Sequence, residues 1–269
     1  MMNSPHSDPV HPSEYLCDVL TADDPTAGLW GLVDAGVADE IIPELPALRL
    51  EQDPIHQHKD VLSHTIAVTS NTAPELTLRL AALFHDVGKP KTRRIDPHDG
   101  VTFRHHEAVG AKMARKRLRA LEFDERTVED VTELVRLSGR FKGYASGWSD
   151  SAVRRYARDA GHLLGLLNQL IRADCTTRNH RKRLELHHHV DALEARIAEL
   201  AEADRKAAER PLLDGKAVMA RYDVGPGRHV GESLAFLLEL RRTEPDLSIE
   251  GTGDRLDIWW KENGPTMSG

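Results

Sequence analysis

Two adjacent residues, His85 and Asp86, carry the strongest chemical signal in this sequence. They close the apolar run Leu-Arg-Leu-Ala-Ala-Leu-Phe-His-Asp-Val-Gly-Lys-Pro, in which Gly88 and Pro90 are residue types that end helices. A helix this apolar is expected to be buried, so an imidazole and a carboxylate at its end need polar partners. A divalent metal ion would satisfy both groups.

Further imidazole and carboxylate groups lie upstream and downstream of this pair. His64 falls on the apolar stripe of a helical segment expected over residues 59–71, and Asp174 lies in a later helical segment. Together the four side chains form a mixed nitrogen and oxygen ligand set without thiolate. Such a set suits one divalent ion and does not choose among manganese, cobalt, nickel, iron, magnesium and zinc.

The order of His, then His-Asp followed by Gly-Lys, then a distant Asp resembles the HD superfamily of metal-dependent phosphohydrolases. In particular, the chain resembles the C-terminal half of bacterial CCA tRNA nucleotidyltransferases, also called polynucleotide adenylyltransferases, of the actinobacterial type. The matching segments extend over nearly the whole chain: 31–45, 58–65, 80–90, 103–112, 150–156 and 172–179. The resemblance implies an all-α fold, an HD-domain helical bundle with flanking N- and C-terminal helices. It also implies the metal ligands His64, His85, Asp86 and Asp174.

The sequence also departs from these relatives. Their nucleotidyltransferase head carries a Gly-Ser element followed by an Asp-x-Asp pair, and no such element occurs here. We therefore interpret the chain as a freestanding HD phosphohydrolase. The relatives have histidines near the positions of Ser138 and Lys142. The change at these positions favours a single metal over a dinuclear centre, and it makes Lys142 a candidate to contact phosphate.

The expected chemistry is attack of a metal-activated water on phosphorus. A divalent cation lowers the pKa of bound water from ~15.7 to ~7 and neutralises phosphate charge. Asp86 is predicted to orient this water, and His105 or His106 to protonate the leaving oxygen. The predicted catalytic residues are Asp86, Lys89, His105 and His106. The predicted substrate-binding residues are Lys89, Lys142 and Arg178.

Arg178 is selected because it lies one helical turn beyond Asp174 in the expected helix, and therefore on the same face. The remaining cations of the runs 112–119 and 181–183 are interpreted as solvated helix faces. Three consecutive histidines, 187–189, resemble a metal-binding run. Because consecutive residues of a helix point in three directions, we interpret them as surface residues.

Three functions fit these residues. The preferred function is hydrolysis of a nucleotide phosphoester, by a 2'- or 3'-nucleotidase, a 2',3'-cyclic phosphodiesterase or a phosphatase acting on a nucleotide analogue. The alternatives are a tRNA-binding module with a vestigial metal site and a (d)NTP triphosphohydrolase. The complete ligand set favours catalysis, and the net charge of −7 disfavours tight tRNA binding. A small-molecule nucleotide is thus preferred over tRNA as the partner, and the oligomeric state is left open.

The 269 residues are expected to form a cytoplasmic protein that does not enter a membrane. The sequence has two cysteines and no signal-peptide pattern, and its longest uncharged stretch, 160–171, is shorter than the ~20 apolar residues that span a bilayer. Strand character is limited to residues around Arg94 and 101–104. The expected order is a mobile arm (1–12), short helices (13–50), the HD core (51–180) and a C-terminal helical region (181–269) that opens with a long charged helix.

Overall fold

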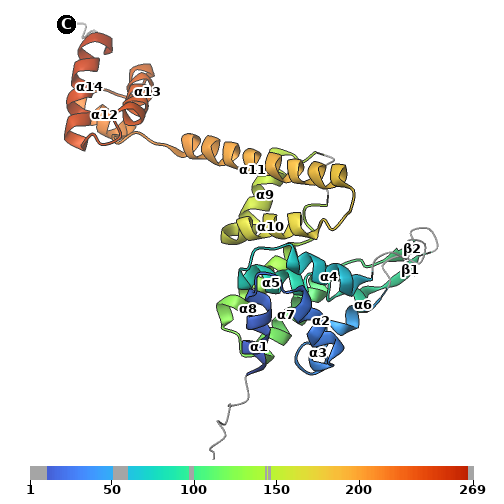
Figure 1. The fold of residues 1–269 in the computed structure, drawn as a ribbon. Helices are drawn as coiled ribbons and strands as arrows, with labels where there is room; N and C mark the ends of the chain where they lie inside the picture. Colours follow the sequence, from blue (N-terminus) through green and yellow to red (C-terminus); the bar gives the residue numbers. More distant parts are fainter. Residues whose placement is uncertain (1–10, 51–59, 97–99, 143, 145–146, 266–269) are drawn as a thin grey trace, which may run out of the picture. The chain divides into compact units, whose positions relative to one another are not determined.

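Helices make up most of the computed structural model, which describes residues 11–50, 60–96, 100–142, 144 and 147–265 (Figure 1). The chain divides into two compact units, Met1–Ala198 and Glu199–Gly269. The first unit begins with α1 (Pro12–Thr21), α2 (Thr26–Asp34), α3 (Val37–Ile41) and the 3-10 helix η1 (Pro46–Leu48). It continues with α4 (Val61–Ser70), α5 (Leu76–Phe84), α6 (Lys89–Thr92), α7 (His106–Ala120), α8 (Glu125–Leu137), α9 (Asp150–Ala160), the 3-10 helix η3 (Gly161–Leu163) and α10 (Leu164–Asp174). The long helix α11 (His180–Ala208) runs across the division between the units.

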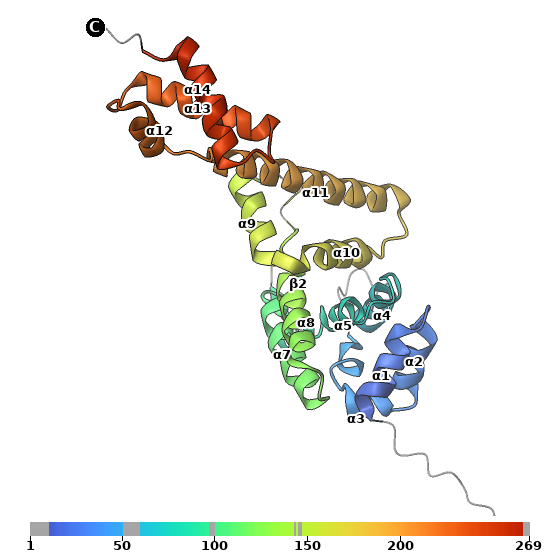
Figure 2. The same ribbon diagram turned by 90° about the vertical axis from the view of Figure 1, so that its left-hand side faces the viewer.

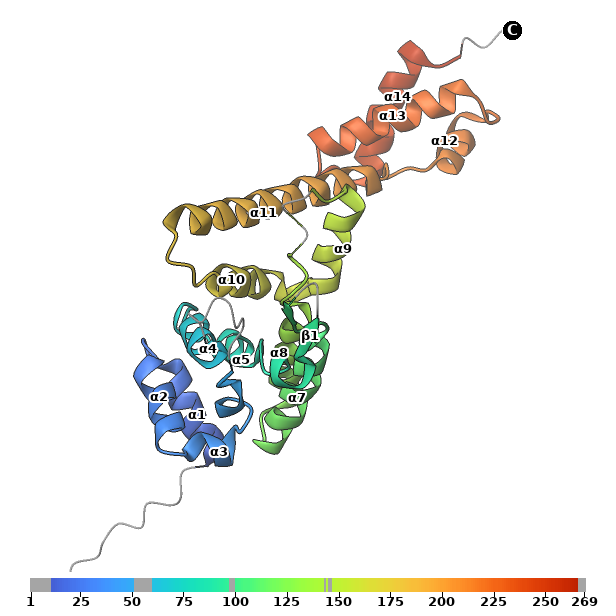
Figure 3. The same ribbon diagram turned by 90° about the vertical axis from the view of Figure 1, so that its right-hand side faces the viewer.

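Helix α5 is the centre of the first unit. It contacts α1, α4, α7, α8 and α10, and every residue from Leu78 to Phe84 is buried. The turned views show α4 and α5 side by side, with α10 next to both (Figures 2 and 3). Glu75 starts α5 by accepting hydrogen bonds from the backbone N–H groups of Thr77 and Leu78. Packing on all sides therefore fixes the end of α5, where His85 and Asp86 follow.

The described strands are β1 (Arg94–Asp96) and β2 (Gly100–Thr102), which pair antiparallel in the register Arg94↔Thr102. The all-α prediction is therefore confirmed, together with the short strand character near Arg94. Of the predicted arm, residues 1–10 lie outside the described residues, and α1 begins at Pro12. No helix among the described residues is long and apolar enough to cross a membrane.

The second unit contains α12 (Gly215–Tyr222), α13 (Arg228–Thr243) and α14 (Ile249–Asn263). Its core is small and includes Val218, Leu237, Leu240 and Leu256. Two aromatic pairs extend this core: the rings of Tyr222 and Trp260 stack at 3.9 Å, and those of Phe236 and Trp259 at 5.3 Å. Both tryptophans belong to α14, which therefore packs against α12 and α13.

A buried arginine ties α1 to α5. Arg79 is 1% exposed, and its guanidinium donates hydrogen bonds to the backbone carbonyls of Leu20, Ala22, Asp23 and Thr72. These carbonyls lie at or just beyond the ends of α1 and α4, where helices leave backbone oxygens without internal partners. One side chain therefore satisfies acceptors from two helix ends.

Replacing Arg79 with methionine keeps the apolar stem and removes every one of these donors. We expect Arg79→Met to lower the free energy of unfolding by about 3 kcal/mol or more, because buried acceptors lose their partners. Urea unfolding followed by circular dichroism measures the change. Arg126→Met is the matched control, since that side chain is 86% exposed, and its unfolding should match the wild type. Equal midpoints for both variants would contradict this role of Arg79.

Candidate metal centre

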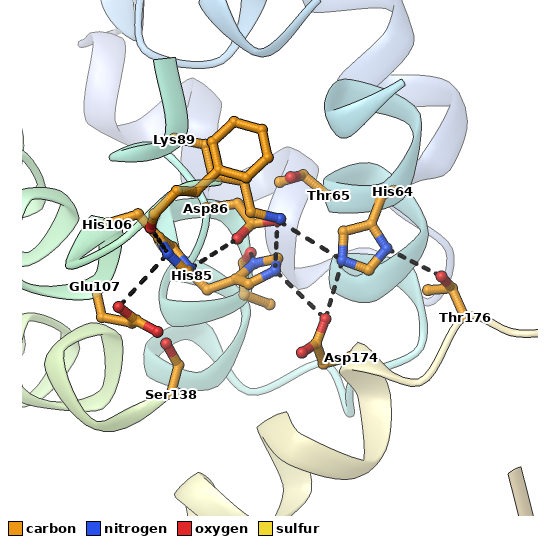
Figure 4. Close-up of polar contacts among 12 residues, drawn as sticks. His64, Thr65, His85, Asp86, Lys89, His106, Glu107, Ser138, Asp174 and Thr176 are labelled. Atoms are coloured by element: carbon orange, nitrogen blue, oxygen red, sulfur yellow. Dashed lines mark hydrogen bonds and ion pairs between the residues drawn. The ribbon is translucent and has the colours of Figure 1, made fainter. Parts of the chain in front are cut away.

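The four predicted metal ligands meet in one place (Figure 4). His64 comes from α4, His85 and Asp86 follow α5 directly, and Asp174 is the last residue of α10. The Oδ1 atom of Asp174 lies 2.9 Å from Nε2 of His64 and 3.6 Å from Nε2 of His85. The Oδ2 atom of Asp86 lies 3.7 and 3.2 Å from the same two nitrogens. Ligands about 2.1 Å from a common ion are roughly 3.0 to 3.4 Å apart, so this spacing fits a metal ion.

The hydrogen bonds of His85 prepare it as a ligand. Its Nδ1 atom donates to the carbonyl of Ala82 at 2.7 Å, which leaves the Nε2 lone pair directed at the carboxylates. This Nε2 atom is buried and has no hydrogen-bond partner among the described residues. His64 is held similarly, with Nδ1 2.9 Å from the hydroxyl of Thr176. The donor set therefore fits a divalent cation, which would accept the lone pairs of both imidazoles.

The charges around His85 also call for a cation. Burial disfavours a charged imidazole, but the carboxylates of Asp86 and Asp174 outweigh burial and raise the pKa of His85 to about 10. Burial also acts to raise the pKa values of Asp86 and Asp174, yet the neighbouring imidazoles hold both well below the usual range. Both carboxylates thus stay ionised and draw a positive charge to the cluster, which can be a proton or a metal ion.

Asp86 links the cluster to two further side chains. Lys89 donates from Nζ to Asp86 Oδ2 at 2.7 Å, and its amine lies over the ring of Phe103. The other oxygen, Oδ1, is 3.5 Å from Nε2 of His106. His106 donates from Nδ1 to the Phe103 carbonyl at 2.7 Å, and burial lowers the pKa of its imidazole. The Nδ1 atom of His106 is thus held by the backbone, and its Nε2 atom faces Asp86.

A pocket of about 240 Å³ opens over the cluster. Its walls include the four predicted ligands together with Lys89, His106, Ser138, Gly139 and Lys142. Ser138 and Lys142, where the sequence analysis expects a departure from the relatives, both line this pocket beside the ligands. The Lys142 amine is mostly exposed and pairs with Glu107 at 3.3 Å. A difference of residue type at these two positions would therefore alter the wall of the pocket itself.

Comparison with known protein families matches an HD domain to residues 61–209. The chain belongs to the HD domain family. This family is a superfamily of metal-dependent hydrolases, and HD domains bind divalent metal ions. The range includes the predicted ligands His64, His85, Asp86 and Asp174.

Curated relatives extend the comparison beyond the HD domain. The chain is 33% identical over 237 residues to the A-adding tRNA nucleotidyltransferase of Deinococcus radiodurans, which covers 85% of this chain and 53% of that protein. It is 36% identical over 236 residues to the CC-adding tRNA nucleotidyltransferase of Thermus thermophilus, covering 84% and 51%. The chain thus spans about half the length of these relatives. The resemblance predicted from sequence is confirmed.

In this HD domain, a glycine allows the segment that carries His85 and Asp86 to touch α7, which carries His106. A Cβ atom at Gly88 would lie 2.1 Å from the carbonyl oxygen of His106 and 2.7 Å from the backbone nitrogen of Gly110. Any other residue would push α7 away from the end of α5. Gly88 therefore sets the distance between Asp86 and His106.

The sequence did not decide between His105 and His106, and the reason it gave for choosing Arg178 was wrong. His105 and His106 were equal candidates, but His105 has a left-handed φ of 62° and is exposed, whereas His106 is buried beside Asp86. The argument for Arg178 was wrong. Helix α10 ends at Asp174, so Arg178 does not follow it by a helical turn; it lines a neighbouring pocket instead. Its part in substrate binding stays a prediction.

Thr176 and Glu107 belong to the site but were not predicted from the sequence. Thr176 is hydrogen-bonded to His64, and Glu107 pairs with Lys142 at the pocket wall. Each lies within two residues of a predicted site residue, and this proximity was the available signal. Both side chains position site residues through hydrogen bonds.

The metal centre predicts opposite results for two histidines. We expect His85→Gln to weaken binding of Mn²⁺ or Co²⁺ about 100-fold or more, because it removes the unpartnered Nε2 ligand. His105→Gln should bind these ions as the wild type does, since its ring is exposed. Isothermal titration of metal-free protein measures both affinities, and circular dichroism confirms that each variant is folded. Equal affinity of wild type and His85→Gln would rule out this centre.

Proposed function

We propose that this chain is a metal-dependent phosphohydrolase that cleaves a nucleotide phosphoester. The observation that carries the proposal is the convergence of His64, His85, Asp86 and Asp174 on an open pocket, where the buried Nε2 of His85 forms no hydrogen bond with any described residue. A purely structural polar cluster would give this nitrogen a hydrogen-bond partner. The ligands instead leave room for a metal ion and, beside it, for a substrate phosphate.

A divalent ion held by the four ligands would supply a water of lowered pKa and neutralise phosphate charge. Asp86 is suited to orient the attacking water, because its Oδ2 faces the ligand imidazoles and its Oδ1 faces His106. The neutral Nε2 of His106 can take a proton from this water and return it to the leaving oxygen. One P–O bond then forms to water oxygen while the ester P–O bond breaks.

Lys89 and Lys142 both line this pocket and supply positive charge to it. Lys89 is 13% exposed and already pairs with Asp86, so it is suited to hold a phosphate oxygen close to the ligands. Lys142 is 71% exposed and pairs only loosely with Glu107, so it can turn towards a substrate. These positions support roles in substrate binding for both lysines.

The preferred substrates are 2'- and 3'-mononucleotides, 2',3'-cyclic nucleotides and their analogues. The relatives named as tRNA nucleotidyltransferases handle nucleotides, which supports a nucleotide over other phosphoesters. A (d)NTP triphosphohydrolase is the alternative within the same chemistry. A cytoplasmic location and a small-molecule partner belong to this proposal.

Binding of tRNA is the second candidate function. It is favoured by the relatives, whose names specify tRNA and whose similarity extends over about 85% of this chain. The net charge of −7 opposes it. The two functions differ in their dependence on the metal ligands, because tRNA binding by a vestigial site would not need Asp86.

Phosphate release tests the hydrolase. We expect turnover of at least one substrate in a panel of 2'-, 3'- and 5'-mononucleotides, 2',3'-cyclic nucleotides and nucleoside triphosphates, assayed with Mn²⁺, Co²⁺, Ni²⁺ or Mg²⁺. Asp86→Asn should reduce kcat at least ~1000-fold, because the carboxylate is needed for both the metal and the water. His188→Ala, on an exposed helix face, should leave kcat unchanged.

Binding of tRNA is measured separately by filter retention at low salt. The hydrolase proposal predicts no specific retention. Tight tRNA binding that survives Asp86→Asn, in folded protein without turnover of any panel substrate, would establish the tRNA-binding module instead.

A further inference from the structure

A second pocket, of about 720 Å³, adjoins the metal centre. It is formed by the end of α4, by α10, by the link between α10 and α11, and by the first turns of α11. Among the described residues, its lining combines apolar side chains such as Ala67 and Ala73 with basic and hydroxyl ones, including Arg172, Thr176, Thr177, Arg178, Arg183 and His187, and contains no carboxylate. The pocket therefore carries positive charge.

Two of these arginines have unused hydrogen-bonding capacity. Arg172 is held by Asp191 and Glu194, which neutralise it. Arg178 and Arg183 are exposed, and no described residue forms an ion pair with either guanidinium. Guanidinium groups bind phosphate with two parallel hydrogen bonds, and neighbouring hydroxyl groups add further donors. The pocket thus offers two free cations to an anionic ligand.

The second pocket and the metal centre share one wall, the segment from Ala173 to Thr176. Asp174 points its carboxylate at His64 and His85, whereas Ala173 and Cys175 on either side of it line the second pocket. Thr176 belongs to both, because it lines the pocket and is hydrogen-bonded to His64. A ligand long enough to extend over this segment would contact both sites.

Helix α4 connects the two sites as well. His64 is a predicted metal ligand, and Ala67 and Asn71 line the second pocket. These three residues recur at intervals of three and four, so they form one stripe along the helix. The second pocket therefore continues the surface on which the metal centre lies.

We propose that the second pocket binds a second phosphate group of the substrate while the scissile phosphoester lies at the metal centre. The inference rests on the proposed hydrolase function and narrows its substrate class to nucleotides with two phosphates. The second phosphate can belong to a small nucleoside bisphosphate or to the backbone of an oligonucleotide. Both kinds of substrate present a phosphate group to Arg178 and Arg183, and they differ in length.

Three substrates and two variants test the proposal. The substrates are 3'-AMP, adenosine 3',5'-bisphosphate and the 3'-phosphorylated dinucleotide ApAp. With wild-type protein, at least one substrate with two phosphates should have a KM about tenfold or more below that of 3'-AMP. The double variant Arg178→Ala/Arg183→Ala should lose this advantage, so that its KM values for the substrates with two phosphates rise to about its KM for 3'-AMP. Arg181→Ala is the matched control, since Arg181 is exposed on the same helix and does not line the pocket.

A gain with the bisphosphate alone assigns the pocket to small nucleotides, and a gain with ApAp assigns it to a strand end. No gain with either substrate overturns the proposal. A gain that persists in the double variant also overturns it, because the advantage would then arise elsewhere.

Direct binding separates this inference from the hydrolase proposal. The dinucleoside monophosphate ApA has an internal phosphate and no terminal phosphoester. Isothermal titration should show ApA binding about tenfold more weakly to the double variant than to the wild type or Arg181→Ala, with a difference that shrinks as salt rises. If the double variant binds ApA more weakly but no substrate is hydrolysed, the phosphate-binding role of the pocket is supported and the hydrolase proposal fails. Equal binding to all three proteins refutes the pocket, whatever the activity.

Discussion

The buried carboxylate of Asp86, held beside two imidazoles and a second carboxylate, is the constraint on which the rest of this HD domain depends. Its charge is shielded from water, so it needs positive or polar neighbours. Lys89 and the imidazoles of His64 and His85 face its Oδ2 atom, and His64 and His85 also face Oδ1 of Asp174. Nε2 of His85 nevertheless forms no hydrogen bond with any described residue. The described side chains therefore balance the negative charge of the carboxylates only in part, and a bound cation would balance the rest.

This cluster requires three helices to bring their ligands to one point. The apolar helix α5 meets the requirement by contacts on all sides, because a helix buried against five neighbours cannot rotate or slide without opening cavities. Arg79 adds to this rigidity by holding helix ends at the opposite part of α5. Helix α5 therefore has two roles. Its buried apolar residues stabilise the fold, and its fixed end positions His85 and Asp86 in the metal centre.

The family and the helical fold could be predicted from the sequence, because the ordered His, His-Asp-x-Gly-Lys and distant Asp pattern resembles HD domains. The explicit stop signals after the apolar helix also placed His85 and Asp86 at its end, where the structure has them. The sequence could not decide between His105 and His106, since that choice depends on a left-handed residue and on how α7 packs against α5. The relation of Arg178 to Asp174 failed because no helix stop marks residue 175, where the backbone leaves the helical conformation. The histidine run shows the same limit: its residues do point in different directions, and tertiary packing places His187 and His189 on the walls of two pockets.

Gly88 shows how a residue without a side chain becomes part of the chemistry. Since backbone atoms of α7 occupy the space of its missing Cβ, the two side chains proposed to act on the attacking water, Asp86 and His106, stay in contact only while that position has no side chain. The chemistry of this site therefore depends on backbone contact at Gly88 as well as on the identity of the ligands.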